Sequence, residues 1–308
     1  MRLLITGASG LLGLNLSLMM QGAHDITGVD RSKLAGVPFE LLRADLLEPG
    51  VEERILDSVR PQAVIHCAAW ADMDACEADP EGARRLNTDL PGQLAQACAQ
   101  RGIRLLHIST DGVYDGLKDG FYTEADAPHP QGVYARTKLA GEQNVLAADP
   151  YALVARVNFF GWSLSGSRSL AEFFLEHLRS GEGCQGFTDV WFCPLFVGHL
   201  AQLLVEMLEK GLSGLYNVLG SEALTKYEFG LRLARQFGLD ESLIEPISVE
   251  DSGLKARRSH NLRVSVHKLS TALGHEIPSV STGLGEFYTQ YQQGYPQKIR
   301  SYQHAGPV

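Results

Sequence analysis

Cysteine is scarce in this sequence of 308 residues, and its five cysteines are an odd number with no C-x-x-C spacing among them. Disulfide frameworks and structural zinc sites need paired or regularly spaced cysteines, so the sequence predicts neither. We expect reduced thiols in a cytoplasmic protein. We also expect no bound metal, because no group of His, Asp and Glu residues has metal-ligand spacing.

Long apolar runs are also missing. Nowhere do the roughly 18 apolar residues that a membrane-spanning helix requires follow one another. The short apolar start at residues 3–5 is interrupted by Thr6 and Gly7, so it is too short for the core of a signal peptide. The sequence therefore predicts a protein with no membrane partner.

Positively charged residues are fewer than negatively charged ones. The chain has 27 Lys and Arg residues and 36 Asp and Glu residues, which gives a formal net charge of −9. A protein that binds nucleic acid broadly usually carries the opposite sign, so we expect no nucleic acid partner. Hydrophobic residues at 44% and charged residues at 20% are ordinary for a globular chain. The length suffices for two lobes.

The first half of the chain alternates short apolar strands with helices. The strand signals are at residues 3–5, 26–29, 39–42, 63–65, 103–108 and 152–157, and the helix signals at 11–20, 51–60, 83–101 and 134–148. Continuous apolar strands are typical of a sheet that is buried on both faces. The pattern predicts an α/β fold, a Rossmann-like doubly wound parallel sheet with a smaller mixed C-terminal substrate lobe.

The alternation breaks near residue 158, where a loop rich in Gly and Ser follows. We therefore divide the chain into a dinucleotide-binding domain, 1–158, and a mainly substrate-binding lobe, 159–308. Some later segments, such as 195–218, are expected to return to the first domain. The stretch after residue 293 is predicted to be a weakly ordered tail.

A glycine-rich turn joins the first strand to the first helix with the spacing G-x-x-G-x-x-G, at Gly7, Gly10 and Gly13. Glycines there allow an unusual backbone turn and a close approach to a pyrophosphate, which the helix N-terminus also favours. The predicted cofactor-binding residues of this turn are Gly7, Ser9, Gly10, Leu11, Leu12 and Gly13.

The second strand ends in Asp30 and Arg31. An acidic residue at this distance from the glycines suits an adenosine ribose and favours NAD, whereas the arginine could meet the 2′-phosphate of NADP. The sequence leaves the choice between NAD and NADP open. Asp45 and Leu46 follow the third strand, where the adenine edge is expected, although Asp45 is nearly as well explained as a loop or capping acid.

A tyrosine and a lysine, Tyr134 and Lys138, lie four residues apart on a predicted helix and so share one face. An ammonium near a phenol favours the phenolate, so the pKa of Tyr134 can fall and the residue can exchange a proton with a carbinol oxygen. Thr110, at the end of the fifth strand, could polarise a substrate carbonyl beside it. Asp111 follows as a local hydrogen-bond acceptor.

Four further segments carry a resemblance to a known family. They are residues 66–77 (HCAAWADMDACE), 86–88 (LNT), 109–116 (STDGVYDG) and 133–142 (VYARTKLAGE). With the glycine turn they resemble the extended short-chain dehydrogenase/reductase family over residues 1–270, and within it the dTDP-4-dehydrorhamnose reductases.

This resemblance implies a catalytic triad of Thr110, Tyr134 and Lys138. Tyr134 would donate the proton, Lys138 would bind the nicotinamide ribose, and Thr110 would orient the sugar carbonyl. The resemblance also places four residues along the cofactor, with Asn87 ordering that region or simply starting a helix. These four are Cys67, Ala68, Ala69 and Trp70.

The activity implied is NAD(P)H-dependent reduction of a 4-keto nucleotide sugar. Dehydratases of the family carry a carboxylate where this chain has Gly112, which disfavours dehydration. The predicted substrate residues are Asp111, Trp191, Arg257 and Arg258, the two arginines within a basic stretch suited to a diphosphate. Trp191 would stack on a base or sugar, or fill the junction between lobes.

Two other functions remain open at this stage. One is a nucleotide-sugar 4-epimerase with tightly bound NAD, and the other is a non-catalytic, reductase-like regulatory subunit. The altered segment 189–195 and Gly112 favour the latter, whereas the intact Tyr134 and Lys138 disfavour it. The resemblance further implies a homodimer, because relatives often pair through helices that flank the sheet.

Overall fold

A seven-stranded parallel sheet is the centre of the molecule, with the strand order β11-β6-β5-β4-β1-β2-β3. The computed structural model describes residues 1–32, 34–252 and 259–303. The sheet consists of β1 (Arg2–Thr6), β2 (Asp25–Asp30), β3 (Glu40–Arg43), β4 (Ala63–His66), β5 (Arg104–Thr110), β6 (Leu153–Val157) and β11 (Gly214–Val218). The prediction of a doubly wound α/β fold is confirmed.

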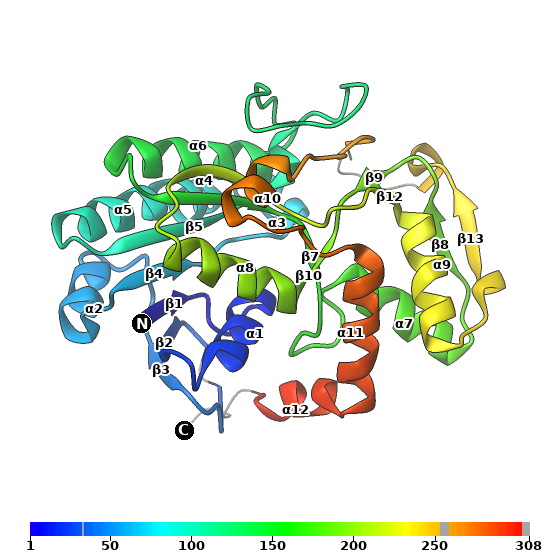
Figure 1. The fold of residues 1–308 in the computed structure, drawn as a ribbon, viewed down its shortest axis with the longest axis horizontal. Coiled ribbons are helices and arrows are strands. Elements are labelled where there is room, and N and C mark those ends of the chain that lie inside the picture. Colours follow the sequence, from blue (N-terminus) through cyan, green and yellow to red (C-terminus); the bar gives the residue numbers. More distant parts are fainter. Residues whose placement is uncertain (33, 253–258, 304–308) are drawn as a thin grey trace.

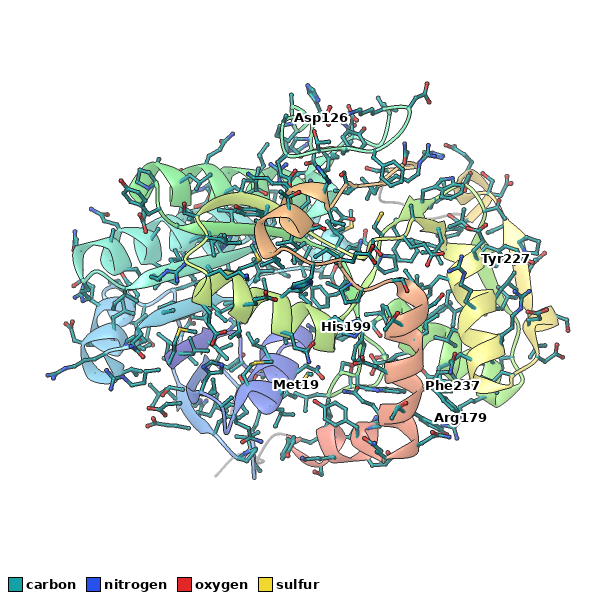
Figure 2. All side chains as sticks on the ribbon, viewed as in Figure 1. Met19, Asp126, Arg179, His199, Tyr227 and Phe237 are labelled. Atoms are coloured by element: carbon teal, nitrogen blue, oxygen red, sulfur yellow. The ribbon has the colours of Figure 1, made fainter. Side chains whose placement is uncertain are left out.

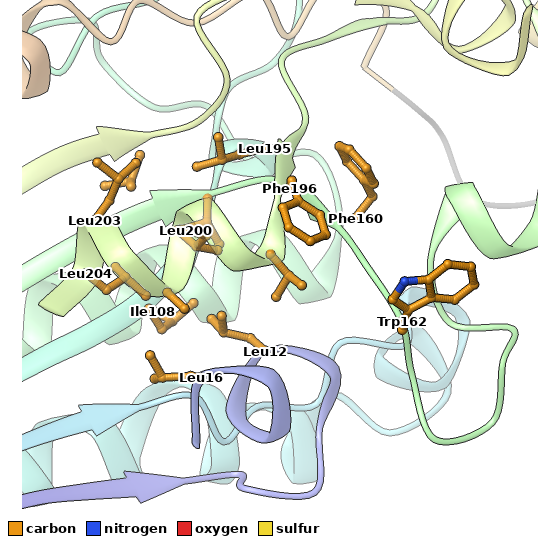
Figure 3. Close-up of a cluster of buried hydrophobic side chains, with 14 of the residues drawn as sticks. Leu12, Leu16, Ile108, Phe160, Trp162, Leu195, Phe196, Leu200, Leu203 and Leu204 are labelled. Atoms are coloured by element: carbon orange, nitrogen blue, oxygen red, sulfur yellow. The ribbon is translucent and has the colours of Figure 1, made fainter. Parts of the chain in front are cut away.

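Helices cover both faces of this sheet (Figure 1). One face packs against α1 (Leu11–Met20) and α8 (Val197–Glu209), and the other against α2 (Val51–Val59), α5 (Leu90–Gln100) and α6 (Val133–Ala148). Figure 3 shows Leu12 of α1 and Leu200 of α8 around Ile108 of β5. Burial on both faces explains why the strands are continuously apolar.

The second half of the chain completes the first sheet. Strand β11 pairs in parallel with β6 at the sheet edge, and α8 packs on α1. Met19 and His199 mark these two neighbouring helices in Figure 2. Residues after 158 therefore add strand β11 to the main sheet and helix α8 to the face of that sheet that α1 covers.

A smaller lobe lies beside the carboxyl ends of the strands (Figure 1). Its helices α7 (Leu170–Ser180) and α9 (Lys226–Phe237) each begin with a capping box and end at a glycine of positive φ, which are strong local helix signals. The short strands pair as β10-β7, β12-β9 and β13-β8. They are β7 (Phe159–Phe160), β8 (Cys184–Phe187), β9 (Trp191–Phe192), β10 (Leu195–Phe196), β12 (Leu224–Thr225) and β13 (Ile244–Ile247).

Two local predictions differ from the structure. The helix expected at 83–101 consists of α4 (Pro80–Arg84), a π-helical turn (Arg85–Asp89) and α5. The prediction of a weakly ordered tail is wrong for α12 (Tyr295–Ser301), because Ile299 is fully buried and the Tyr295 hydroxyl donates to Asn15 Oδ1 at 3.1 Å. Tertiary packing orders this helix.

The other helical segments are short, apart from α11 (Val280–Gln292), which packs along the lobe. They are α3 (Met73–Ala78), α10 (His267–Leu273) and the single turns Asp111–Val113, Glu241–Leu243 and Val249–Ser252. Among the described residues, no helix combines the length and the apolar character needed to cross a membrane.

Candidate active site

The glycine turn forms a compact loop between β1 and α1. Gly7 has φ +67°, and a Cβ atom on Gly7 would lie 2.7 Å from the backbone nitrogen of Ala68. A Cβ atom on Gly13 would overlap the carbonyl oxygen of Gly7. Helix α1 has no side-chain cap and no acidic residue in its first turn, so its N–H groups stay available to an anion. These features fit the diphosphate of a dinucleotide.

A cavity of about 500 Å³ opens from this turn along the carboxyl ends of the strands. Parallel α/β sheets bind ligands in such crevices, where the strand order reverses, here between β1 and β4. The structure brings most of the predicted cofactor-binding residues together here. Its lining includes Gly7, Ser9, Gly10, Leu11, Leu12, Gly13, Asp30, Arg31, Asp45, Leu46, Cys67, Ala68, Ala69, Tyr134 and Lys138.

Asp30 also has a structural role at this cavity. Its carboxylate accepts hydrogen bonds from the backbone N–H groups of Ser9 and Ser32, each at 3.0 Å. The guanidinium of Arg43, at the end of β3, donates from Nε to the carbonyl of Arg31 at 3.3 Å. Two exposed arginines therefore flank Asp30 at this end of the cavity. Asp45 likewise accepts from the N–H of Leu47 at 3.0 Å while it lines the cavity.

Tyr134 lies in the first turn of α6 and points into the cavity beside Thr110, at the end of β5. Burial raises the pKa of the Tyr134 phenol to about 12, and a hydrogen bond from Thr110 acts in the opposite direction. The expectation that Lys138 lowers this pKa is not met in the structure. At neutral pH the phenol is protonated, the state that a proton donor requires.

Lys138 is buried one turn further along α6. Its Nζ donates to the carbonyl of Ile108 at 2.6 Å and lies 3.3 Å from Nε2 of His107. Burial lowers the pKa of Lys138 to about 8, opposed by the charge of Glu142. Both groups that contact the ammonium directly are neutral, and Glu142 acts on it only through its charge.

A row of buried polar side chains lies under α6 and continues behind Lys138. His66 and His107 stack with ring centroids 5.4 Å apart, and Thr6 Oγ1 lies 2.7 Å from His66 Nδ1. Burial lowers the pKa of both histidines, so they are neutral at pH 7. The contact between Lys138 Nζ and His107 Nε2 joins this row to α6.

The same polar row contains a buried ion pair. Glu142 on α6 pairs with Arg156 on β6 at 2.7 Å, and Ser109 donates to the same carboxylate at 2.5 Å. Both charged side chains are almost fully buried. The pair connects α6, which carries Tyr134 and Lys138, to strand β6 of the sheet.

Asp111 lies behind Thr110 and does not line the cavity. Its carboxylate is buried and accepts a hydrogen bond from Asn158 Nδ2 at 2.9 Å. Burial raises the pKa of Asp111 to about 6, and the Asn158 and Thr110 hydrogen bonds oppose this rise. Gly112 follows at the start of a single turn, and no second carboxylate stands there.

Among the other predicted substrate residues, Trp191 does not line this cavity. Trp191 is half-buried in β9, and the Arg263 guanidinium lies 5.2 Å above the centre of its ring. Arg257 and Arg258 lie outside the described residues. The proposed roles of these three residues in substrate binding stay predictions.

Asn87 and Trp70 are the predicted cofactor residues that do not line the cavity. Asn87 is fully buried in the π-helical turn, where Oδ1 accepts from the Trp70 N–H at 2.9 Å and Nδ2 donates to the Trp70 carbonyl at 3.0 Å. The amide thus clamps the backbone that follows β4. Asn87 holds the segment of Cys67 to Trp70 in place rather than lining the cavity itself.

Sequence reasoning did not assign several residues that line the cavity. They include Ser32, Leu86, Ile108, Val157, Phe159 and Arg168. Ser32, Ile108 and Val157 could have been found, because each adjoins a strand end that the sequence predicts. Arg168 had no such signal, since only the tertiary fold brings its loop to the cavity.

The sheet order, the glycine turn and the Tyr134–Lys138 pair beside Thr110 define an extended short-chain dehydrogenase/reductase fold and site. The family model described as the RmlD substrate binding domain matches residues 1–293. The chain belongs to this family, and the resemblance inferred from the sequence is confirmed. Members of the family include NAD(P)-dependent reductases.

Three curated relatives are similar over most of their length. The probable low-salt glycan biosynthesis reductase Agl14 of Haloferax volcanii is 33% identical over 284 residues, 91% of this chain and 95% of the relative. A dTDP-4-dehydrorhamnose reductase of Mycobacterium tuberculosis is 33% identical, covering 92% of both chains. Methionine adenosyltransferase 2 subunit beta of Mus musculus is 31% identical, covering 92% of this chain and 86% of the relative.

Among solved structures, a dTDP-4-dehydrorhamnose reductase of Bacillus anthracis in complex with NADP is similar with a TM-score of 0.84 and 25% identity. The match covers 94% of this chain and 99% of that one. The family likeness therefore extends over both the sheet and the smaller lobe.

Proposed function

We propose that this protein catalyses the NAD(P)H-dependent reduction of a 4-keto nucleotide sugar, as a reductase similar to dTDP-4-dehydrorhamnose reductase. The observation that carries the proposal is the position of the Tyr134 phenol beside Thr110 in the wall of a cavity that begins at the glycine turn. The relatives named as reductases support the same class of reaction.

A nicotinamide cofactor held in this cavity would supply the hydride for the reaction. Tyr134 donates its proton to the oxygen of the former carbonyl as negative charge develops there. Thr110 orients that oxygen through its hydroxyl group. Lys138 adds a positive charge that is held between two neutral groups, the Ile108 carbonyl and the His107 ring, and so retains its effect on the developing anion.

Gly112 favours reduction over dehydration, and the named relatives favour reduction over epimerisation. Water elimination needs a second acid or base beside Asp111, and Gly112 supplies none. An epimerase would use the same tyrosine first to accept and then to return the proton, and the relatives named as reductases favour reduction over this alternative. An epimerase would interconvert two nucleotide sugars without consuming added NADPH.

We further infer that NADPH is preferred to NADH. Asp30 already accepts two backbone hydrogen bonds, and Arg31 and Arg43 flank it with exposed guanidinium groups that suit a 2′-phosphate. The substitution Arg43→Ala should lower kcat/KM for NADPH about tenfold and leave that for NADH unchanged. Arg54→Ala on the exposed face of α2 is the control, and equal losses with both cofactors would contradict the inference.

A second candidate function is a non-catalytic subunit of another enzyme. The similarity to a protein named as a subunit of methionine adenosyltransferase 2 favours it. The retained Thr110, Tyr134 and Lys138 arrangement opposes it, because a subunit without activity has no chemical need for this geometry.

The experiment that separates these functions uses the full-length protein and a panel of 4-keto nucleotide sugars with NADPH or NADH. A reductase consumes the reduced cofactor and forms the 4-hydroxy sugar. Tyr134→Phe should abolish turnover and keep cofactor affinity, measured by calorimetry, since it removes only the hydroxyl group. Turnover of the variant at the wild-type rate would refute the mechanism, and cofactor binding with no turnover of any sugar would favour the non-catalytic subunit.

A further inference from the structure

The loop between β7 and α7 leaves the smaller lobe and returns to the first helix of the sheet domain. At its base, Asn15 of α1 donates from Nδ2 to the carbonyl of Trp162 at 2.9 Å. The Trp162 ring is buried and stacks on Phe287 with centroids 3.8 Å apart. The start of the loop is therefore fixed against α1.

The end of the loop is fixed by Glu172, a buried carboxylate in the first turn of α7. Its Oε1 accepts from the N–H of Ser163 at 2.7 Å. Its Oε2 accepts from the Ser163 hydroxyl at 2.7 Å, the N–H of Arg168 at 3.0 Å and the N–H of Ser169 at 3.2 Å. Among the described residues this carboxylate forms no ion pair, and its hydrogen-bond donors come from the loop itself.

These bonds hold the backbone of Arg168 while its side chain lines the cavity with Gly10, Leu11 and Leu12 at the start of α1. In the part of the chain that the structure describes, its guanidinium forms no hydrogen bond or ion pair. The charged residues of the lining are Asp30, Arg31, Asp45, Lys138 and Arg168. Lys138 is engaged at Ile108, and Arg31 lies at the end of β2, where the 2′-phosphate contact is proposed, so Arg168 is the remaining lining cation for a diphosphate at the glycine turn.

We propose that Arg168 binds the diphosphate of the dinucleotide cofactor from the side opposite the glycine turn. A guanidinium matches phosphate oxygens with a fork of donors, and the N-terminus of α1 supplies the facing N–H groups. The loop would thus link the smaller lobe to the bound cofactor. This inference rests on the proposed function, since it assumes that the cavity takes NADP or NAD.

The test measures ligand binding directly, by calorimetry on the full chain. The ligands are NADP⁺, ADP-ribose, which keeps the diphosphate, and adenosine 2′-monophosphate, which lacks it. The variants are Arg168→Ala and Arg168→Lys. The matched control is Arg179→Ala, because this arginine follows on α7 and lies over the Tyr291 ring, in the smaller lobe (Figure 2).

Arg168→Ala should weaken NADP⁺ and ADP-ribose about 10- to 100-fold and leave the monophosphate unchanged. Arg168→Lys should recover part of the loss, and Arg179→Ala should bind all three ligands as the wild type does. Unchanged ADP-ribose affinity in Arg168→Ala would overturn the inference, as would a loss confined to the KM of a nucleotide sugar. If the wild type bound none of the nucleotides, the proposed function itself would fail.

Discussion

Removing the Glu142 charge while leaving its size, with Glu142→Gln, should destabilise the protein strongly. The carboxylate is only about 4% exposed, and Arg156 binds both of its oxygens, with Nε at 2.9 Å from Oε1 and Nη2 at 2.7 Å from Oε2. The substitution leaves the Arg156 charge buried without an anion, because its other partner is the Tyr114 hydroxyl at 2.9 Å. Breaking one side of a buried pair costs about 3–5 kcal/mol, so we expect a loss of that size in the free energy of unfolding.

Urea unfolding followed by tryptophan fluorescence measures this loss as a shift in the transition midpoint. The exposed pair of Arg235 and Glu241 is the control, and Glu241→Gln should cost at most about 1 kcal/mol. Adding Arg156→Met to Glu142→Gln removes the uncompensated charge and should recover about 2 kcal/mol. A loss below about 1 kcal/mol for Glu142→Gln alone would refute the reasoning, as would a double variant less stable than the single one.

Three further predictions concern the cofactor turn, the pH dependence and a helix cap. Gly13→Ala places a Cβ atom on the Gly7 carbonyl oxygen and should weaken NADP⁺ binding more than tenfold, whereas Gly285→Ala, where a Cβ meets nothing within 4 Å, should bind normally in calorimetry. Burial lowers the pKa of Lys138 to about 8, so the ammonium loses its proton as the pH rises through that value. The kcat/KM for reduction should therefore fall above pH 8, and a kcat/KM that stays constant to pH 10 would contradict this. Thr225→Ala removes the hydroxyl that accepts from the Glu228 N–H and should cost about 1 kcal/mol in urea unfolding, with Thr225→Ser recovering it.

The sheet and the glycine turn could be predicted because their signals are local. Apolar strands, a G-x-x-G-x-x-G turn and helix caps each depend on a few neighbouring residues. The π-helical turn at Arg85–Asp89 has no such signal. It places Asn87 so that its amide reaches both backbone groups of Trp70, seventeen residues earlier in the chain. Only tertiary contacts decide that arrangement.

The electrostatics of the catalytic pair were harder to predict than its position. Spacing alone indicates that Lys138 and Tyr134 share a helix face, and this led to the expectation of a lowered tyrosine pKa. In the structure, burial dominates and raises it, while the ammonium turns toward Ile108 and His107. The desolvation of a side chain depends on the whole fold, so it cannot be predicted from the spacing of two residues on one helix.

The position of β11 determines when the main sheet can form during synthesis and where the chain can be truncated. This strand, at residues 214–218, covers the edge of β6, whose five residues are all buried. A fragment that ended at residue 158 would expose β6 as an unpaired apolar edge, the kind of surface that templates aggregation. The nascent chain can complete its main sheet only after about two thirds of it has left the ribosome. A soluble cofactor-binding fragment would therefore have to extend beyond residue 218.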